Sequence, residues 1–203
     1  GLDPFTVRNL ELFQPTHAGG VALIGVIDYT KTAMGGRLLR HWLAFPLLNL
    51  DAIEKRHEVI ATFLASEELH AALQQMLQQT IDIERIMAKI ATEKIAPRAL
   101  VQLQHSLTFL KPLGPLLEKA DSNALKALSK KWRDPQNWID QLQQQLDPEA
   151  PVLVSKGKVI AAGYSQELDT LRGLKSSVQE HLDSLLERET KRTQIPSLKI
   201  AFN

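Results

Sequence analysis

The chain consists of stretches with helical periodicity that are separated by prolines and polar residues. From Ala33 to Phe45, apolar residues recur at steps of three and four, which is the spacing of one buried stripe on an amphipathic helix. Pro46 ends this pattern, because proline cannot continue a helix. Similar stripes predict further helices over 51–64, 69–77, 83–90, 97–110, 123–131 and 135–146. The pattern therefore predicts a mainly all-α protein with a helical bundle as its core.

Local signals predict where several of these helices begin and end. Asp51 and Asp82 each stand at the start of an apolar stripe and are expected to act as N-caps. Pro97 suits the first turn of the helix that follows it, and Pro112 and Pro115 are expected to break that helix.

Two adjacent glycines, Gly35 and Gly36, stand at the start of the first long helix. We expect them to turn the backbone closely into this helix, with Thr30 or Thr32 available as its cap. The pair does not form a phosphate-binding loop, which requires Gly, four residues and then Gly-Lys-Ser or Gly-Lys-Thr.

Only two stretches have the character of short strands. They are "LIGVIDYT" over 23–30 and the end of "PSLKIAFN", where residues 198, 200 and 202 are apolar and alternate with polar or small residues. Minor short strands are therefore expected beside the helical bundle.

The longest predicted helix covers 164–190, and at 1.5 Å per residue it would span roughly 40 Å. It carries a narrow apolar seam on an otherwise charged surface, formed by Leu168, Leu171, Val178, Leu182 and Leu185. Since a compact domain of this size does not need so long a helix for its core, we expect a projecting arm or a strut between domains.

Composition narrows the possible environments and partners. The 203 residues are 44% hydrophobic and 23% charged, with 24 Lys and Arg against 23 Asp and Glu, so a nucleic-acid or acidic partner would need a local basic surface. The absence of cysteine excludes disulfides, zinc ribbons and thiol chemistry, and fits a reducing compartment. No stretch approaches the ~20 apolar residues of a membrane span, and no signal peptide precedes the first helix. A cytoplasmic protein without a membrane segment is expected.

Candidate chemistry is sparse, and we expect no catalytic, cofactor-binding or metal-binding residue in this chain. Gly157-Lys158 lacks the rest of a phosphate loop, and the six histidines are scattered without the spacing of a zinc site. Asp82 and Glu84 are two residues apart, so on a helix they are expected to point in different directions. Capping and an ion pair with Arg85 explain this group better than acid–base catalysis. An independent enzyme is therefore not expected.

Two local basic groups are candidates for contacts with nucleic acid. The first comprises Lys126, Lys130, Lys131 and Arg133, and is better explained as a solvated helical face. The second comprises Arg188, Lys191, Arg192 and Lys199 at the far end of the long helix. For this group phosphate contacts and solvation are about equally good explanations, although Glu187 and Glu189 dilute its charge.

Five separated blocks of the sequence carry a family resemblance. They are "TVRNLELF" over 6–13, "GVIDYTKTAMGGRLLRHWLAFPL" over 25–47, "DIERI" over 82–86, "GYSQELDTLR" over 163–172 and "ERETKRTQIPSLKIAFN" over 187–203. In this order and with this spacing, they resemble the middle of the MutS family of DNA mismatch-recognition ATPases in its bacterial form. The match extends over essentially the whole chain.

The resemblance implies a helical core, or lever, domain over 1–163. Over 164–203 it implies the lever helix, leading into a clamp domain of which the end of this sequence would be the first strand. In the family, this region transmits nucleotide state to the clamp and DNA state back to the ATPase. We also expect Arg37, Trp42, Arg85 and Leu171 to hold the bundle, and Arg188, Lys191, Arg192 and Lys199 to contact the DNA backbone.

The sequence also departs from the full family pattern. The family's mismatch-reading Phe-x-Glu motif and its ATP-binding loop are absent from these residues. This segment is therefore expected neither to recognise a mismatch nor to hydrolyse ATP by itself. For a longer parent protein, the resemblance implies ATP and magnesium, mismatched double-stranded DNA, a homodimer and a MutL-type partner in the repair of DNA damage.

A second hypothesis stays open beside the non-catalytic lever and connector. The chain is then a free-standing helical scaffold that binds a partner protein through the seam over 168–185. The two hypotheses differ in what surrounds the segment in its gene, because only the first requires a mismatch-reading domain upstream and an ATP-binding loop downstream.

Overall fold

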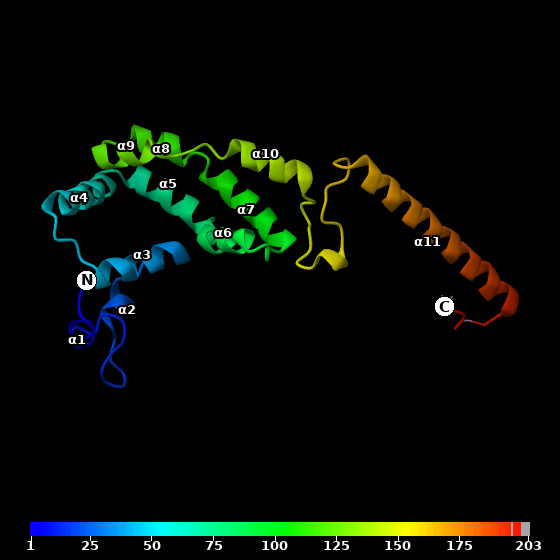
Figure 1. Ribbon diagram of the computed structural model, residues 1–203, viewed down its shortest axis with the longest axis horizontal. Coiled ribbons are helices and arrows are strands. Elements are labelled where there is room, and N and C mark those ends of the chain that lie inside the picture. The colour runs from blue at the N-terminus through cyan, green and yellow to red at the C-terminus, as the bar shows by residue number, and fades with distance from the viewer. Residues whose placement is uncertain (196, 200–203) are drawn as a thin grey trace. The chain divides into compact units, whose positions relative to one another are not determined.

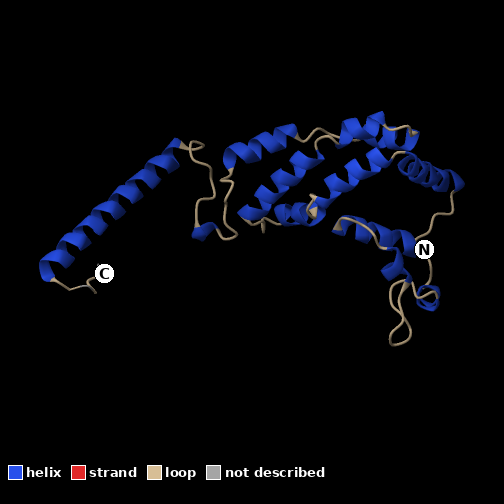
Figure 2. Ribbon diagram, turned by 180° about the vertical axis from the view of Figure 1, so that it is seen from behind, coloured by secondary structure: helices blue, strands red, loops and turns tan. Residues whose placement is uncertain are grey.

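The computed structural model describes residues 1–195 and 197–199, and helices dominate it (Figure 1). The described residues form no sheet, and Figure 2 shows helices joined by loops. The prediction of a mainly all-α fold is confirmed. The chain divides into two compact units, Gly1–Val159 and Ile160–Asn203, which are described separately. The predicted domain boundary after residue 163 stays a prediction.

The first unit contains ten α-helices and one short 3₁₀-helix within its described residues. They are α1 Pro4–Asn9, α2 Leu23–Ile27, α3 Ala33–Ala44, α4 Leu50–Ala65, α5 Glu67–Gln78, α6 Ile83–Ala91, α7 Pro97–Leu110, α8 Leu113–Lys119, α9 Asn123–Ser129, α10 Gln136–Gln145 and the 3₁₀-helix Val154–Lys156. Helices α8 and α9 pack on each other and lie over α5 and α4, respectively, while α10 packs on α7 (Figure 1). α7 in turn contacts α5 and α6, so α4 to α10 form the bundle.

Two apolar clusters hold this bundle together. One joins α5, α8 and α9 through buried Leu69, Leu117, Ala120 and Leu125, with Phe63 of α4 packed against it. The other joins α7 to the end of α10 and the loop beyond, through Val101, Leu146 and Ala150. Burial of such side chains is the main stabilising term in a bundle of short helices.

Side-chain caps start most of the longer helices, as the polar residues before each apolar stripe indicate. The Thr32 hydroxyl accepts from the Gly35 amide at 3.0 Å, and Asn49 caps α4 through the Ala52 amide at 2.9 Å. The prediction that Asp51 is the cap of α4 is wrong, since Asp51 lies in the first turn. There its carboxylate faces the positive end of the helix dipole instead.

The glycine pair lies inside the first turn of α3 and does not turn the chain into it. A Cβ on Gly35 would lie 3.1 Å from the Thr32 hydroxyl and 3.3 Å from Thr30 Cβ. The glycine therefore permits close approach of the preceding loop, while Thr32, one of the two predicted caps, satisfies its amide.

The strand predicted over 23–30 is wrong, because Leu23–Ile27 forms the short helix α2. Its amides bond to nearby chain: Leu23 N donates to Glu11 O at 2.9 Å, and Ile24 N to Leu12 O at 3.0 Å. These bonds to residues 11 and 12, with the helical bond from Asp28 N to Ile24 O at 3.0 Å, satisfy backbone groups of this apolar run without a partner strand among the described residues. The strand predicted near the C-terminus falls mostly on residues outside the described part of the chain.

Besides α2, two further helices were not predicted. α1 begins at Pro4 after the Asp3 cap, and α8 carries Pro115 in its first turn, where proline removes no helical hydrogen bond. Pro112 does follow the end of α7 at Leu110, so the predicted break is correct, but a new helix starts at once.

The second unit is dominated by α11, Gln166–Thr193, a single helix of 28 residues. Ser165 caps it, and Arg172 Nη2 donates to the Ile160 carbonyl at 2.9 Å, which ties its first turns to the preceding chain. The long helix predicted over 164–190 is confirmed, and none of its residues is buried. Within residues 1–195 and 197–199, no helix combines the length and the apolar content that crossing a membrane requires.

Replacing Leu125 by alanine should destabilise the bundle strongly, because Leu125 is 2% exposed in the cluster under α9. We expect Leu125→Ala to lower the free energy of unfolding by about 2 to 5 kcal/mol. Leu128→Ala, on the same helix but 51% exposed, should change it by no more than about 0.5 kcal/mol. Urea titration followed by circular dichroism measures both. Equal losses in the two variants would contradict this account of the core.

Candidate functional site

An ion cluster around Arg37 is the most distinctive polar feature of the first unit. Arg37 on α3 donates two parallel hydrogen bonds to Asp82, from Nη1 to Oδ2 and from Nη2 to Oδ1, each at 2.7 Å. It also donates to Glu84 Oε2, from Nη2 at 2.6 Å and from Nε at 3.2 Å. One guanidinium therefore holds two carboxylates from a segment 45 residues further along the chain.

Asp82 also has a second structural role, because it is the N-cap of α6. Its Oδ1 accepts from the Arg85 amide at 3.3 Å, so the carboxylate serves both the helix start and Arg37. The residue before it is tied to α7: the Ile81 amide donates to Ser106 Oγ at 3.1 Å. Ser106 is 1% exposed and donates in turn to the Gln79 carbonyl at 3.3 Å. Hydrogen bonds from Arg37 to Asp82 and from Ile81, the residue before Asp82, to Ser106 thus link α3, the start of α6 and α7.

The electrostatics of the cluster follow from these bonds. The hydrogen bonds from Arg37 hold the pKa of Asp82 at about 2, below its ordinary value of 3.8, with a smaller contribution from the Arg85 amide. The same bonds raise the pKa of Arg37 further above its ordinary range. The Asp82 side chain is 18% exposed and that of Glu84 is 66% exposed, so the Asp82 pair is the better shielded of the two.

The prediction that Asp82 and Glu84 point in different directions is wrong, because both reach the Arg37 guanidinium. Asp82 lies outside α6 as its cap, so helical angular spacing does not apply to it. The predicted capping is present, and so is the predicted ion pair of Arg85 with Asp82, at 3.4 Å. Periodicity could not indicate Arg37 as the partner, because the pairing joins elements distant in sequence. For Ser106 no local signal exists either.

The other residues predicted to hold the bundle lie in different surroundings. Trp42 is 39% exposed, and the Arg56 guanidinium carbon lies 3.6 Å from its ring centroid, which is a cation–π contact between α3 and α4. Arg85 is exposed on α6. Leu171 is exposed on α11 in the second unit. The supporting roles of these residues stay predictions.

The predicted DNA-backbone cations lie at and beyond the end of α11. Arg192 Nε lies 2.7 Å from Glu189 Oε2, and Arg188 Nε lies 3.9 Å from Glu189 Oε1. Among the described residues, Lys191 and Lys199 form no ion pair, and both are exposed. Glu189 therefore offsets part of the positive charge, and the phosphate contacts stay a prediction.

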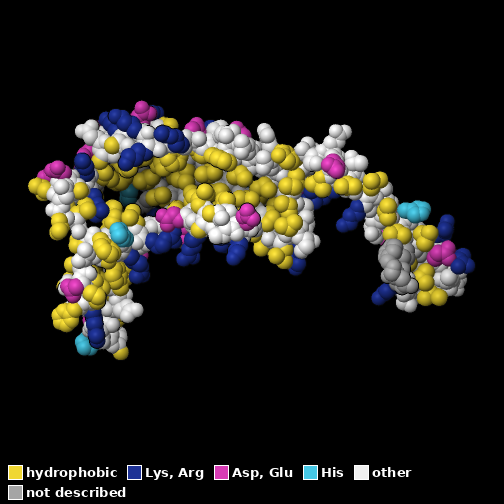
Figure 3. Space-filling view, in the orientation of Figure 1, with side chains coloured by type: hydrophobic (Ala, Val, Ile, Leu, Met, Phe, Trp, Pro, Cys, Tyr) yellow, Lys and Arg dark blue, Asp and Glu magenta, His cyan; other side chains and the backbone are white. Residues whose placement is uncertain are grey.

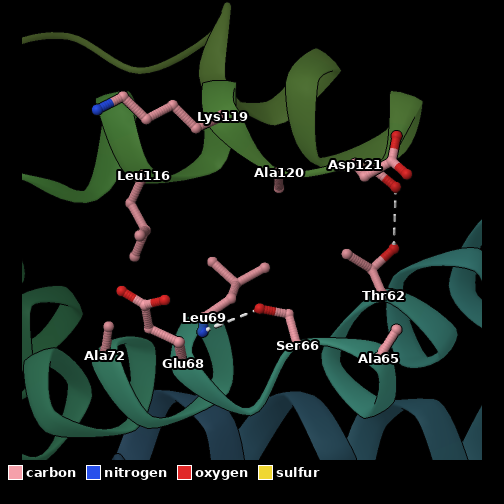
Figure 4. A pocket seen from close by; sticks show the side chains of 10 residues that line it. All are labelled: Thr62, Ala65, Ser66, Glu68, Leu69, Ala72, Leu116, Lys119, Ala120 and Asp121. Carbon is pink, nitrogen blue, oxygen red and sulfur yellow. Dashed lines mark hydrogen bonds between the residues drawn. The ribbon is translucent and has the colours of Figure 1, made fainter.

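A pocket of about 580 Å³ lies between the α4–α5 junction and α8 (Figure 4). Its two hydroxyls are engaged with backbone groups: Ser66 Oγ accepts from the Leu69 amide at 3.3 Å, and Thr62 Oγ1 lies 2.9 Å from the Glu58 carbonyl oxygen and 3.4 Å from that of Asp121. Glu68 and Lys119 come from opposite walls. Because no lining hydroxyl is paired with a base, the pocket offers no activated nucleophile.

The lowered pKa of Asp82 predicts a dependence of stability on pH. A carboxylate whose pKa is lower in the folded state stabilises that state above its unfolded pKa, and this contribution disappears as the pH falls from about 4 toward 2. The loss of stability caused by Asp82→Asn should therefore be constant above about pH 5 and shrink below pH 4. Urea midpoints between pH 7 and pH 2 measure it.

Arg37→Met provides the control, because Arg37 is the largest cause of the shift. In the Arg37→Met background, Asp82→Asn should show a much weaker pH dependence. The same pH dependence in both backgrounds would mean that Arg37 does not set the titration of Asp82.

Comparison with known proteins places the chain in a family. The family model described as MutS domain III matches residues 5–190. A protein from Christiangramia forsetii named "DNA mismatch repair protein MutS" is 42% identical over 202 residues, which cover 100% of this chain and 23% of that protein. Proteins of the same name from Flavobacterium psychrophilum and Porphyromonas gingivalis are 40% and 39% identical, with the same coverage.

The chain thus spans about 23% of the length of these curated relatives. The family model covers most of the chain, and the relatives match it throughout. This chain belongs to the MutS domain III family.

Proposed function

We propose that this chain is a non-catalytic connector of a DNA mismatch repair protein, which couples a DNA-binding clamp to an ATPase region. The Arg37 cluster carries the proposal, because it joins α3 to the start of α6 and, through Ile81 and Ser106, to α7. Displacement of α3 is then transmitted to two helices of the bundle. Coupling between distant sites requires an element of this kind, with contacts that differ between two arrangements.

The Arg37 cluster is charged and partly exposed to solvent, which suits a contact whose geometry changes. α3 has no buried residue, and the Arg37 cluster gives it a charged contact with the start of α6. Arg37 and Glu84 are partly or largely exposed, which keeps the pair exchangeable with water. The 28-residue α11 adds a long element of regular structure, suited to carry displacement along its axis.

The remaining parts of the proposal concern a longer protein. There, we propose that mismatched double-stranded DNA is bound, that ATP and magnesium are used outside these residues, and that the protein acts as a homodimer with a MutL-type repair partner. The names of the relatives support a role in DNA mismatch repair. A cytoplasmic location is part of the same proposal.

A second candidate function rests on the seam of α11. Leu171 and Val178 of this seam are each more than half exposed, so this face is open to another helix. A free-standing scaffold that binds a partner protein would use the same surface. A gene that encodes no ATP-binding loop downstream of this segment would favour the scaffold.

Coupling is testable in a full-length chimera, in which this chain replaces the matching segment of the C. forsetii relative. Arg37→Met should reduce the stimulation of ATP hydrolysis by mismatched duplex at least about fivefold, the lower end of typical allosteric coupling. Basal hydrolysis should be retained, because no residue of this chain is proposed to contact ATP. Lys89→Met, which removes an exposed cation from α6, is the matched control. Unchanged stimulation in Arg37→Met would refute the proposed coupling.

The cations near the end of α11 can be tested with the chain itself. We expect weak binding to a fluorescent duplex that is equal with and without a mismatch and falls with salt. Lys191→Gln should lower the slope of log affinity against log salt by about 0.9, as expected for one lost phosphate contact. Glu189→Gln should tighten binding, because it releases Arg188 and Arg192 from their ion pairs.

Lys175→Gln, a change of the same kind nearer the start of α11, should leave both the affinity and the slope unchanged. Identical effects of Lys175→Gln and Lys191→Gln would show that the end of the helix makes no particular phosphate contact.

A further inference from the structure

An apolar groove with a basic rim lies between α3, α4 and α9 in the first unit, with a volume of about 560 Å³. Its apolar lining includes Trp42, Val59, Ile60, Phe63, Ala127 and Leu128. Val59 and Phe63 pack against the buried cluster under α9, so the floor of the groove continues into the core. Ile60 and Leu128 are more than half exposed. Exposed apolar side chains that continue into the buried core are suited to bind the apolar surface of a ligand.

The contact between Trp42 and Arg56 shapes one wall of the groove. The guanidinium stacks on the indole with its carbon 3.6 Å from the ring centroid. Stacking uses the face of the guanidinium and leaves its N–H edges available for a carboxylate. Among the described residues, Arg56 forms no ion pair.

The charges around the groove are mostly positive. Lys55 and Arg56 of α4 line the groove, and neither forms an ion pair within the described part of the chain. Lys126, Lys130 and Lys131, on α9 and directly after it, add positive charge outside the lining. Residues 122–133 contain four cations and no acidic residue. Figure 3 shows Lys and Arg side chains gathered over α8 and α9, above apolar surface.

One acidic side chain, Glu58, belongs to the lining. Its Oε1 accepts from the Ser122 hydroxyl at 2.7 Å and from the Ala124 amide at 3.2 Å, and these bonds lower its pKa. Glu58 thus fastens α4 to the start of α9 and is engaged inside the fold. The rim remains basic, with cations that lack acidic partners in the described residues.

We propose that this basic-rimmed groove binds an amphipathic helix of a partner protein, with an apolar face and acidic flanking residues. The apolar lining accommodates anchor side chains at positions such as i, i+3 and i+7, and the cations at the rim pair with the flanking carboxylates. DNA fits less well, because phosphates gain nothing from an apolar floor. The seam of α11 from a second copy also fits less well, since Arg172 and Lys175 lie beside it.

Two synthetic helical peptides test the proposal on the 203-residue chain. Both carry leucines at i, i+3, i+4 and i+7; one has Glu at the flanking positions and the other has Lys. Calorimetry should give at least tenfold tighter binding of the Glu peptide. The variant Ile60→Ala/Leu128→Ala should weaken that binding at least fivefold, and Lys55→Gln/Arg56→Gln should reduce the preference for Glu over Lys.

Met87→Ala, which removes an exposed apolar side chain from α6 outside the groove, should leave binding unchanged. Circular dichroism of each variant confirms that the fold is retained. Equal binding of the two peptides, or binding unaffected by the groove variants, overturns the proposal. Self-association of the chain that the groove variants abolish, without peptide binding, assigns the groove to a second copy. Loss of duplex binding in these variants, again without peptide binding, assigns it to nucleic acid.

Discussion

The hydrogen bonds between the Arg37 guanidinium and the carboxylates of Asp82 and Glu84 connect α3 to the start of α6, 45 to 47 residues further along the chain. Helix α3 has no buried residue, whereas α5, α7, α8 and α9 all contribute buried side chains to the bundle. The position of α3 against the start of α6 therefore relies on a charged, bidentate contact. Since Asp82 also caps α6, changes at α3 act directly on a helix terminus.

A contact made by ion pairs responds to displacement differently from a contact made by packed apolar side chains. A packed core resists small displacement because its side chains interlock, while an exposed ion pair such as Arg37–Glu84 exchanges with water at little net cost. In this unit the two kinds of contact are separated: Leu125 and its neighbours fix α5, α8 and α9, and Arg37 attaches α3. The arrangement combines an apolar bundle with a charged attachment of α3, which suits the proposed role as a connector.

Most helices could be predicted from local sequence patterns, whereas the ion pairs between residues distant in sequence could not. Apolar stripes indicated α3 to α7 and α9 to α11, and hydroxyl or carboxyl caps such as Thr32 and Asp82 marked their starts. The apolar run at 23–27 was wrongly predicted to be a strand, because a short apolar run is compatible with either a strand or a short helix. Arg37 was expected to hold the bundle, but its partners 45 and 47 residues away are set by the tertiary fold alone. The groove between α3, α4 and α9 depends in the same way on helices that come together only in three dimensions.

Hydrogen exchange of the wild-type chain and of Arg37→Met, followed by mass spectrometry, tests the central claim that Arg37 couples α3 to α6 and α7. The account predicts faster exchange in α3 together with the first turn of α6 and the segment around Ile81. It predicts little change in α9, because the apolar cluster that holds α9 does not include the Arg37 ion pairs. Faster exchange confined to α3, or no change in any of these segments, would contradict it.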